Sequence, residues 1–259
     1  MITITDQTGR LITLQKFPHK IISLVPSQTE LLHFLSLEEE TIGITKFCIH
    51  PKEWYRAKTR VGGTKTLNIP LIRSLKPNLI FANKEENEEA QIKELYKEFT
   101  VYISDIKTLD DALKMIADVG LLTNRSTQTI ELIENIKFRF NNLKPGKEVK
   151  ACYLIWQKPY MAAGGDTFIN NMMKRCGFVN IMADRNRYPK TTIEELKSLN
   201  CELLLLSSEP FPFKEKHIAE IKEMGFAGKI LLVDGEMFSW YGSRLLKATD
   251  YFHSLYPLT

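Results

Sequence analysis

Four consecutive leucines at positions 203–206 constrain the fold of this chain more than any other feature of its sequence. A strand with one face in water alternates apolar and polar residues, whereas a run that is apolar at every position must be buried on both faces. Such strands are typical of parallel sheets that helices cover on both sides. The stretch 21–25, which is apolar except for Ser23, and the fully apolar stretch 79–82 follow the same pattern. The chain is therefore predicted to be an α/β protein.

Strand and helix signals alternate along both halves of the chain. Residues 2–14 alternate apolar and polar positions around a glycine-containing turn, which predicts an opening β-hairpin. Ser27 with Glu30, and Thr192 with Glu195, have the three-residue spacing of a helix capping box. Each pair follows or precedes an apolar strand, as expected for strand–helix units that build a parallel sheet.

The segment 108–143 has a different pattern. Apolar residues recur in it at helical spacing and no proline interrupts them, which predicts one long helix or two nearly collinear ones. We therefore expect two α/β lobes with largely parallel sheets, residues 1–107 and 144–259, joined by this helix. A ligand cleft is expected between the lobes.

Composition excludes several other classes of protein. The 259 residues are 44% hydrophobic and 25% charged, as in ordinary globular proteins. The net charge of +4 is scattered along the chain, so a nucleic-acid partner is not indicated. No apolar run approaches the length of a membrane span. Residues 1–20 show no signal peptide, which leaves a cytoplasmic location open.

The four cysteines are widely spaced and form no CxxC motif, so neither a disulfide framework nor a zinc site is indicated. Phosphate-loop, dinucleotide-binding and GxSxG motifs are missing from the sequence. No metal site or catalytic set is therefore predicted from motifs. Cys48 and His50 could act together as metal ligands or as a nucleophile pair, but without further clustered ligands or a local signature a solvated loop is the favoured explanation.

Ligands of parallel α/β sheets bind beyond the carboxyl ends of the strands, so the residues at those positions are the candidates for a binding site. Helix capping, tight turns and core packing are the alternative explanations for them, and both readings stay open. The candidates in the first lobe are Ser27, Gln28, Phe47, His50, Thr64 and Asn83. The candidates in the second lobe are Trp156, Gly165, Glu209, Phe211, Phe213, Phe238, Trp240 and Tyr241.

The second set contains an unusual loop directly after the four leucines, "SSEPFPF", residues 207–213, which we call the aromatic loop. Loops are normally polar because they face water. Pro210 and Pro212 restrict the backbone, so they would present Phe211 and Phe213 without a large ordering cost. This favours a preformed surface for a ligand with apolar or planar parts.

Three motifs resemble one known family. The sequences "PSQTE" at 26–30, "LKPNLI" at 75–80 and "AGGDTFINNMMKRCGF" at 163–178 are similar to segments of the class III periplasmic substrate-binding proteins. These are the helical-backbone receptors that deliver cobalamin, haem or ferric siderophores to ABC importers. The similarity in the order of elements extends over nearly the whole chain.

The resemblance implies a monomeric binding protein that is not an enzyme, has no tightly bound cofactor and lies in the periplasm or at the membrane. It implies a chelated-metal ligand, with cobalamin or a ferric siderophore favoured and haem as a further candidate. It also implies that an ABC permease docks on one exposed acidic residue per lobe, for which Glu89 and Glu215 fit by position. The alternative is a cytoplasmic enzyme or sensor on the same scaffold that uses Cys48 and His50.

Overall fold

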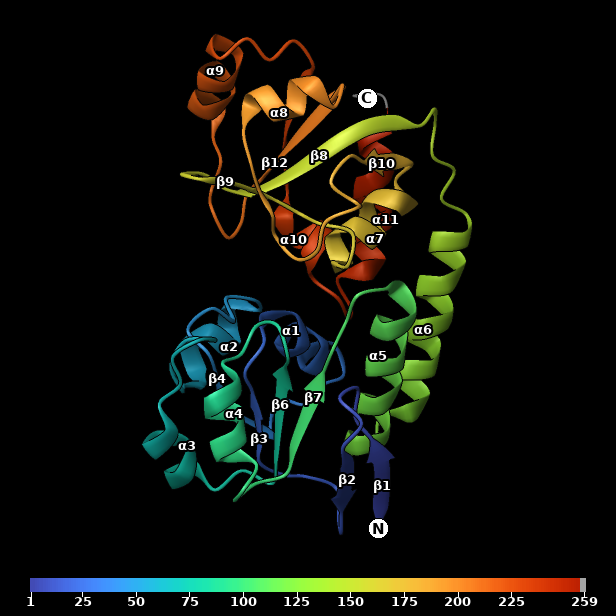
Figure 1. Cartoon of the computed structure of the whole chain (residues 1–259). Helices are drawn as coiled ribbons and strands as arrows, with labels where there is room; N and C mark the ends of the chain where they lie inside the picture. Colours follow the sequence, from blue (N-terminus) through green and yellow to red (C-terminus); the bar gives the residue numbers. More distant parts are fainter. Residues whose placement is uncertain (257–259) are drawn as a thin grey trace. The chain divides into compact units, whose positions relative to one another are not determined.

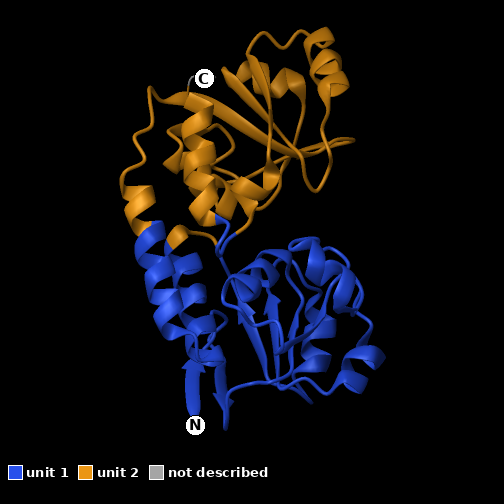
Figure 2. Cartoon of the chain, turned by 180° about the vertical axis from the view of Figure 1, so that it is seen from behind, with its two compact units in different colours: residues 1–106, 110–136, 241–244 blue, residues 107–109, 137–240, 245–259 orange. Residues whose placement is uncertain are grey.

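The structure is a computed structural model and describes residues 1–256. The chain forms two compact units, shown in different colours in Figure 2. Unit 1 contains residues 1–106, 110–136 and 241–244, and unit 2 contains residues 107–109, 137–240 and, within the described part of the chain, 245–256. The predicted lobes and connecting segment are therefore interleaved, since the chain passes between the units several times.

Unit 1 is built on a five-stranded sheet in the order β5-β4-β3-β6-β7, in which every neighbouring pair is parallel. Helical crossovers between successive strands produce this parallel arrangement. The strands are β3 (Ile21–Ser23), β4 (Thr41–Ile44), β5 (Thr59–Arg60), β6 (Leu79–Asn83) and β7 (Val101–Ser104). The helices after the first four are α1 (Pro26–Phe34), α2 (Lys52–Ala57), α3 (Ile69–Leu75) and α4 (Glu89–Leu95).

The predicted opening hairpin is confirmed, and β1 (Ile2–Thr5) pairs antiparallel with β2 (Leu11–Leu14). All residues of β3 and β6 are buried, as expected for strands between two layers of helices. Their apolar side chains form the core of unit 1 together with residues from α3 and α4, among them Ile72 and Ile92.

Unit 2 contains a mixed six-stranded sheet. Strands β8 (Val149–Trp156), β12 (Leu203–Ser207) and β13 (Lys229–Val233) are parallel, and β10 (Phe178–Asn180) also pairs parallel with β8. Strand β9 (Tyr160–Ala162) is antiparallel to both β8 and β11 (Lys190–Thr191). The helices of this unit are α7 (Phe168–Arg175), α8 (Ile193–Ser198), α9 (Glu215–Glu223), α10 (Gly235–Ser239) and α11 (Leu245–Leu255).

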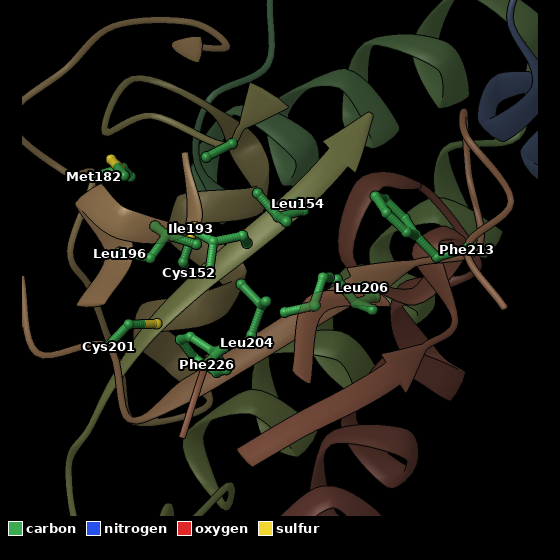
Figure 3. Packing of buried hydrophobic residues seen from close by; sticks show 12 residues of the cluster. Cys152, Leu154, Met182, Ile193, Leu196, Cys201, Leu204, Leu206, Phe213 and Phe226 are labelled. Atoms are coloured by element: carbon green, nitrogen blue, oxygen red, sulfur yellow. The ribbon is translucent and has the colours of Figure 1, made fainter. Parts of the chain in front are cut away.

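The four leucines lie in β12 and all are buried, which confirms the prediction made from them. Leu204 and Leu206 belong to one apolar cluster with Cys152 and Leu154 of the adjacent strand β8 (Figure 3). Phe213 of the aromatic loop is part of the same cluster. The core of unit 2 therefore extends into the loop that follows β12.

The segment 108–143 forms two helices, α5 (Leu109–Thr123) and α6 (Ser126–Asn141), which lie side by side (Figure 1). Asn124 ends α5 in a left-handed conformation with φ of 59°. A Cβ atom added to Gly120 would lie 2.0 Å from Oγ1 of Thr129, so the helices approach closely where α5 has no side chain. The prediction of one long helix or two nearly collinear helices is wrong, because the chain turns back at Asn124.

The predicted capping boxes have different outcomes. Thr192 caps α8 and its hydroxyl accepts a hydrogen bond from the N–H of Glu195, as predicted. Ser27 does not cap α1, because that helix begins at Pro26 and no side chain caps its first turn. Glu30 instead forms an ion pair with Arg244. Within residues 1–256, no helix is long and apolar enough to cross a membrane.

Candidate functional site

The carboxyl edge of the sheet in unit 1 collects the first set of candidate residues. Because its five strands are parallel, their carboxyl ends all lie along one edge. The segments that leave this edge contain Ser27 and Gln28 after β3, Phe47 and His50 after β4, Thr64 after β5, and Asn83 at the end of β6. Six of the predicted residues, in segments at the carboxyl ends of four strands, therefore lie along one edge of this sheet.

Buried polar side chains connect these segments. Nε2 of Gln28 donates a hydrogen bond to Oγ of Ser104 over 2.7 Å, and Nδ2 of Asn83 donates to the same oxygen over 3.0 Å. Nδ2 of Asn87 donates to the carbonyl oxygen of Thr64 over 3.1 Å. Ser27, Gln28 and Asn83 are each at most 3% exposed. These side chains hold the edge together and are covered by other parts of the protein.

Two exposed apolar side chains of this edge lie in the loop after β4. Phe47 is 51% exposed and Ile49 is 45% exposed. The ammonium of Lys46 lies 5.2 Å from the centroid of the Phe47 ring, within the range of a cation–π contact. His50 is partly buried beside them. Sequence reasoning missed Ile49, although its spacing of two from Phe47 would have indicated a pair of apolar side chains in one loop.

Cys48 is fully buried and accepts a hydrogen bond at its Sγ from Oγ1 of Thr29 over 3.1 Å. Oγ1 of Thr45 lies 3.2 Å from the same sulfur. Burial raises the pKa of the Cys48 thiol to about 11. A reactive cysteine needs a depressed pKa and access to substrate, so Cys48 is not an activated nucleophile.

Tyr241 was predicted among the residues of the second lobe, and this placement is wrong. The segment Tyr241–Arg244 belongs to unit 1. The hydroxyl of Tyr241 donates to Oε1 of Glu86 over 3.1 Å, and Nε of Arg244 donates to Oε2 of Glu30 over 2.9 Å. Sequence spacing could not reveal this, because Tyr241 follows β13 and α10 of the other unit directly.

The carboxyl edge of the sheet in unit 2 presents two accessible aromatic side chains. Trp156 ends β8 and is 40% exposed, and Phe211 of the aromatic loop is partly exposed. Their ring centroids lie 5.7 Å apart in an edge-to-face contact. Phe213 and His217 lie behind Phe211, are buried, and contact its ring at centroid distances of 4.8 and 5.3 Å.

The other aromatic candidates of unit 2 are in the interior. Phe238 is fully buried and packs against Tyr153 and Phe252 at centroid distances of 5.1 and 4.9 Å. Phe213 lies in the apolar cluster described above and Trp240 is 7% exposed. The prediction that all of them line a ligand surface is therefore wrong for Phe213 and Phe238, whose partners are core side chains. Trp156 and Phe211 are the accessible pair.

Glu209 of the aromatic loop is held by two donors. Its Oε1 accepts hydrogen bonds from Oγ of Ser239 over 2.7 Å and from Nε1 of Trp240 over 2.9 Å. Burial raises the pKa of the Glu209 carboxyl above its ordinary value. These bonds join the aromatic loop to α10 and the residue after it.

Gly165 has a packing role. A Cβ atom there would lie 2.0 Å from the carbonyl oxygen of Ala183. The carbonyl oxygen of Gly165 also accepts a hydrogen bond from Nδ2 of Asn170 over 2.7 Å. Gly165 is therefore needed for close packing of the backbone. Such a structural role is the alternative to ligand binding that the sequence left open.

Glu89 and Glu215 are the first residues of α4 and α9, and both are exposed. Glu89 pairs with Lys93 one turn later. Across residues 1–256, no group of three or more histidine, cysteine or acidic side chains could hold a metal ion. All four cysteines are free and buried.

A family model described as "Periplasmic binding protein" matches residues 21–224 of the chain. The chain is 25% identical over 277 residues to the ABC transporter substrate-binding lipoprotein YvrC of Bacillus subtilis, covering 100% of this chain and 86% of YvrC. It is 27% identical over 187 residues to the vitamin B12-binding protein of Vibrio cholerae, covering 70% of this chain and 67% of that protein.

Among solved structures, the chain is similar to a possible iron-binding, periplasmic solute-binding protein from Staphylococcus epidermidis. That comparison has a TM-score of 0.78 and 26% identity, and it covers 93% of this chain and 100% of that protein. These relatives are named as binding proteins and give no support to a cytoplasmic enzyme or sensor. The predicted resemblance is confirmed: this chain belongs to the periplasmic binding protein family.

Proposed function

We propose that this protein is the substrate-binding component of an ABC importer and binds a chelated-metal ligand. The observation that carries the proposal is the accessible aromatic pair, Trp156 and Phe211, at the carboxyl edge of the parallel strands of unit 2. Exposed aromatic rings at the strand ends of an α/β sheet are suited to a ligand with flat or apolar surfaces. In such a function the ligand is bound and released without a covalent change, so no catalytic residues are required.

The proposed ligand class is cobalamin or a ferric siderophore, with haem as a further member. Support comes from the names of relatives, which include a vitamin B12-binding protein and a possible iron-binding protein. Such ligands are large and expose much apolar area, so their burial against aromatic side chains supplies the driving force. Because Phe211 rests on the buried Phe213 and His217, its ring is already in place before binding.

Unit 1 has candidate ligand contacts of its own at the carboxyl edge of its sheet. Phe47 and Ile49 offer exposed apolar area, and His50 and Thr64 offer polar groups that are not fully buried. Gln28 and Asn83 support these loops through their buried hydrogen bonds to Ser104, and Ser27 is buried in the segment next to Gln28. They act as positioning residues, whereas Phe47 and Ile49 touch the ligand.

We infer that Glu89 and Glu215 contact the permease. Each is exposed and begins a helix, so its charge is favoured by the helix dipole. The ion pair of Glu89 with Lys93 is at the surface and weak, so a permease can compete for this carboxylate. The same proposal places the protein outside the inner membrane, either in the periplasm or attached by a lipid anchor. It is supported by the family and by the lipoprotein YvrC. We also infer that the protein acts as a monomer.

The proposal is tested by titrating intrinsic tryptophan fluorescence with cyanocobalamin, haemin and a ferric hydroxamate, each corrected for absorption by the ligand. Trp156 is the exposed member of the three tryptophans, so its emission reports directly on a ligand at the edge of unit 2. We expect saturable quenching by one of these ligands with a dissociation constant in the micromolar range or tighter.

The Trp156→Ala variant should bind that ligand about tenfold or more weakly, as measured by calorimetry, because the ring loses roughly 1.5–3 kcal/mol of burial. Phe138→Ala is the matched control, since Phe138 is 70% exposed on α6 and belongs to neither candidate edge. No binding of any of the three ligands by folded protein would reject the chelated-metal proposal. Equal losses in both variants would reject the role of Trp156.

A further inference from the structure

Unit 2 contains a cavity that has no part in the proposed ligand site. Its volume is about 650 Å³, which lies within the range of small-molecule pockets. Three segments form it: the turn between β8 and β9, the chain from β11 into α8, and the second half of α9. Its lining residues are Gln157, Lys158, Pro159, Tyr160, Thr191, Thr192, Ile193, Glu194, Glu220, Glu223 and Met224.

The charge of this cavity is negative. Glu194, Glu220 and Glu223 contribute three carboxylates from two helices, against the single ammonium of Lys158. Hydrogen bonds, first of all one from its own backbone, lower the pKa of Glu194, so this group is ionised at neutral pH. The cavity therefore favours a cation over an anion or a neutral ligand.

One of the carboxylates is held in place. Nε2 of Gln157, in the turn between β8 and β9, donates a hydrogen bond to Oε2 of Glu220 over 2.9 Å. The same amide nitrogen lies 3.5 Å from the hydroxyl of Tyr160. This contact joins the turn to α9 and fixes the direction of the Glu220 carboxylate before any ligand binds. A fixed acceptor loses less conformational entropy on binding than a free side chain does.

The rest of the lining decides what kind of cation fits. Pro159, Tyr160 and Met224 add apolar surface beside the carboxylates, whereas Ile193 is buried in the core of unit 2. Within the described residues, no three acidic, histidine or cysteine side chains are grouped so as to hold a metal ion. Separated charges next to apolar and aromatic surface suit an ammonium group carried on a hydrocarbon body.

We propose that this cavity is a second binding site of the protein, specific for small organic ammonium ions. The ammonium group pairs with Glu220 and Glu223, and the hydrocarbon part lies against Tyr160 and Met224. The site shares no residue with the proposed contacts of the chelated-metal ligand, so the two proposals stand or fall separately.

The test uses n-butylammonium as the probe and butyrate as the anion of matched length. Each is titrated into the full chain, labelled with ¹⁵N and followed by amide chemical shifts. We expect butylammonium to give saturable shifts in residues 157–160 and 220–224 with a dissociation constant of millimolar order, and butyrate to give none. Raising the ionic strength should weaken the binding, because the charges are accessible to salt.

The double variant Glu220→Gln/Glu223→Gln keeps the shape of the cavity and the partner of Gln157 but removes two charges. It should bind butylammonium about fivefold or more weakly. Glu215→Gln is the matched control, because Glu215 lies on the same helix but does not line the cavity. The proposal is overturned if butyrate shifts the same residues equally, if the double variant binds as well as the native protein, or if butylammonium produces no saturable shifts. None of these outcomes affects the titrations with cobalamin, haemin or the ferric hydroxamate.

Discussion

The hydroxyl of Tyr241 donates a hydrogen bond to the Glu86 carboxylate over 3.1 Å, although 155 positions separate the two residues in the sequence. Tyr241 is buried, and burial raises its pKa well above the ordinary value, so the phenol stays protonated and serves as a donor. This contact attaches a segment from the last part of the chain to unit 1, next to the carboxyl end of β6.

Replacing Tyr241 by phenylalanine removes this donor and keeps the ring. We expect the free energy of unfolding to fall by about 1–2 kcal/mol, because the partly buried carboxyl group of Glu86 loses a hydrogen-bond donor. Urea denaturation measures this change. Tyr55→Phe is the control, since Tyr55 is 37% exposed, and it should change stability by less than about 0.5 kcal/mol. Equal effects of the two variants would contradict a stabilising role for the Tyr241–Glu86 bond.

Arg244 and Glu30 form an ion pair whose side chains are only 8% and 15% exposed. Arg244→Met should lower the free energy of unfolding by about 3–5 kcal/mol, because it leaves the carboxylate of Glu30 without its cation in a poorly solvated place. Adding Glu30→Gln to that variant should restore part of the loss. For comparison, Arg73→Met breaks a pair with Glu98 in which both side chains are more than 40% exposed. Solvent screens that exposed pair, so Arg73→Met should cost much less stability than Arg244→Met. Equal costs for the two variants would refute this prediction.

Gly120→Ala tests the contact between α5 and α6. The new Cβ would lie 2.0 Å from Oγ1 and 2.9 Å from Cβ of Thr129, so the short threonine side chain cannot move out of the way. We expect a loss of about 1–3 kcal/mol in thermal or urea unfolding, despite the better helix propensity of alanine. Gly146→Ala is the control, because a Cβ there meets nothing within 4 Å. Stabilisation by Gly120→Ala would mean that the two helices are not in this contact.

The raised pKa of the Glu209 carboxyl leads us to expect a specific dependence of the free energy of unfolding on pH. Because burial raises its pKa above the ordinary value of 4.5, the folded protein binds a proton that the unfolded chain releases. The stability contributed by this group is complete below the unfolded pKa and is lost as the pH rises through the folded pKa. In Glu209→Gln this part of the loss should disappear, as measured by urea unfolding at several pH values from 4 to 7. The exposed Glu215→Gln variant should keep the native profile, and an unchanged profile in Glu209→Gln would contradict the prediction.

The buried thiols predict low chemical reactivity. All four cysteines are free and buried, and burial raises the pKa of Cys48 to about 11. Native protein should therefore react only very slowly with a thiol-specific disulfide reagent at pH 8, whereas the unfolded chain should expose four reactive groups. Rapid modification of Cys48 in native protein would reopen the possibility of a nucleophilic role.

Much of the architecture could be predicted from the chain. The leucines of β12 have apolar side chains on both faces, so only a buried strand between helical layers accommodates them. Once parallel strands were expected, their carboxyl ends indicated where Phe47, Trp156 and Phe211 would lie. These three side chains are indeed exposed or partly exposed at those edges.

The helix hairpin was not predictable from the same kind of pattern. Apolar residues at helical spacing continue from α5 into α6, and both one long helix and two packed helices need that spacing. The turn depends on the left-handed backbone of Asn124 and on the fit of Thr129 against Gly120. That fit exists only when the second helix lies beside the first.

The sequence by itself determined the α/β class, the parallel strand ends and the presence of an aromatic loop, because these depend on local spacing and on which residues can be buried. The tertiary structure decided which aromatic side chains are accessible. Phe211 and Phe213 are two residues apart in one loop, yet Phe213 enters the core beside Leu206 while Phe211 stays partly exposed next to Trp156. The difference arises because burial depends on neighbours that distant parts of the chain supply, and no local pattern contains them.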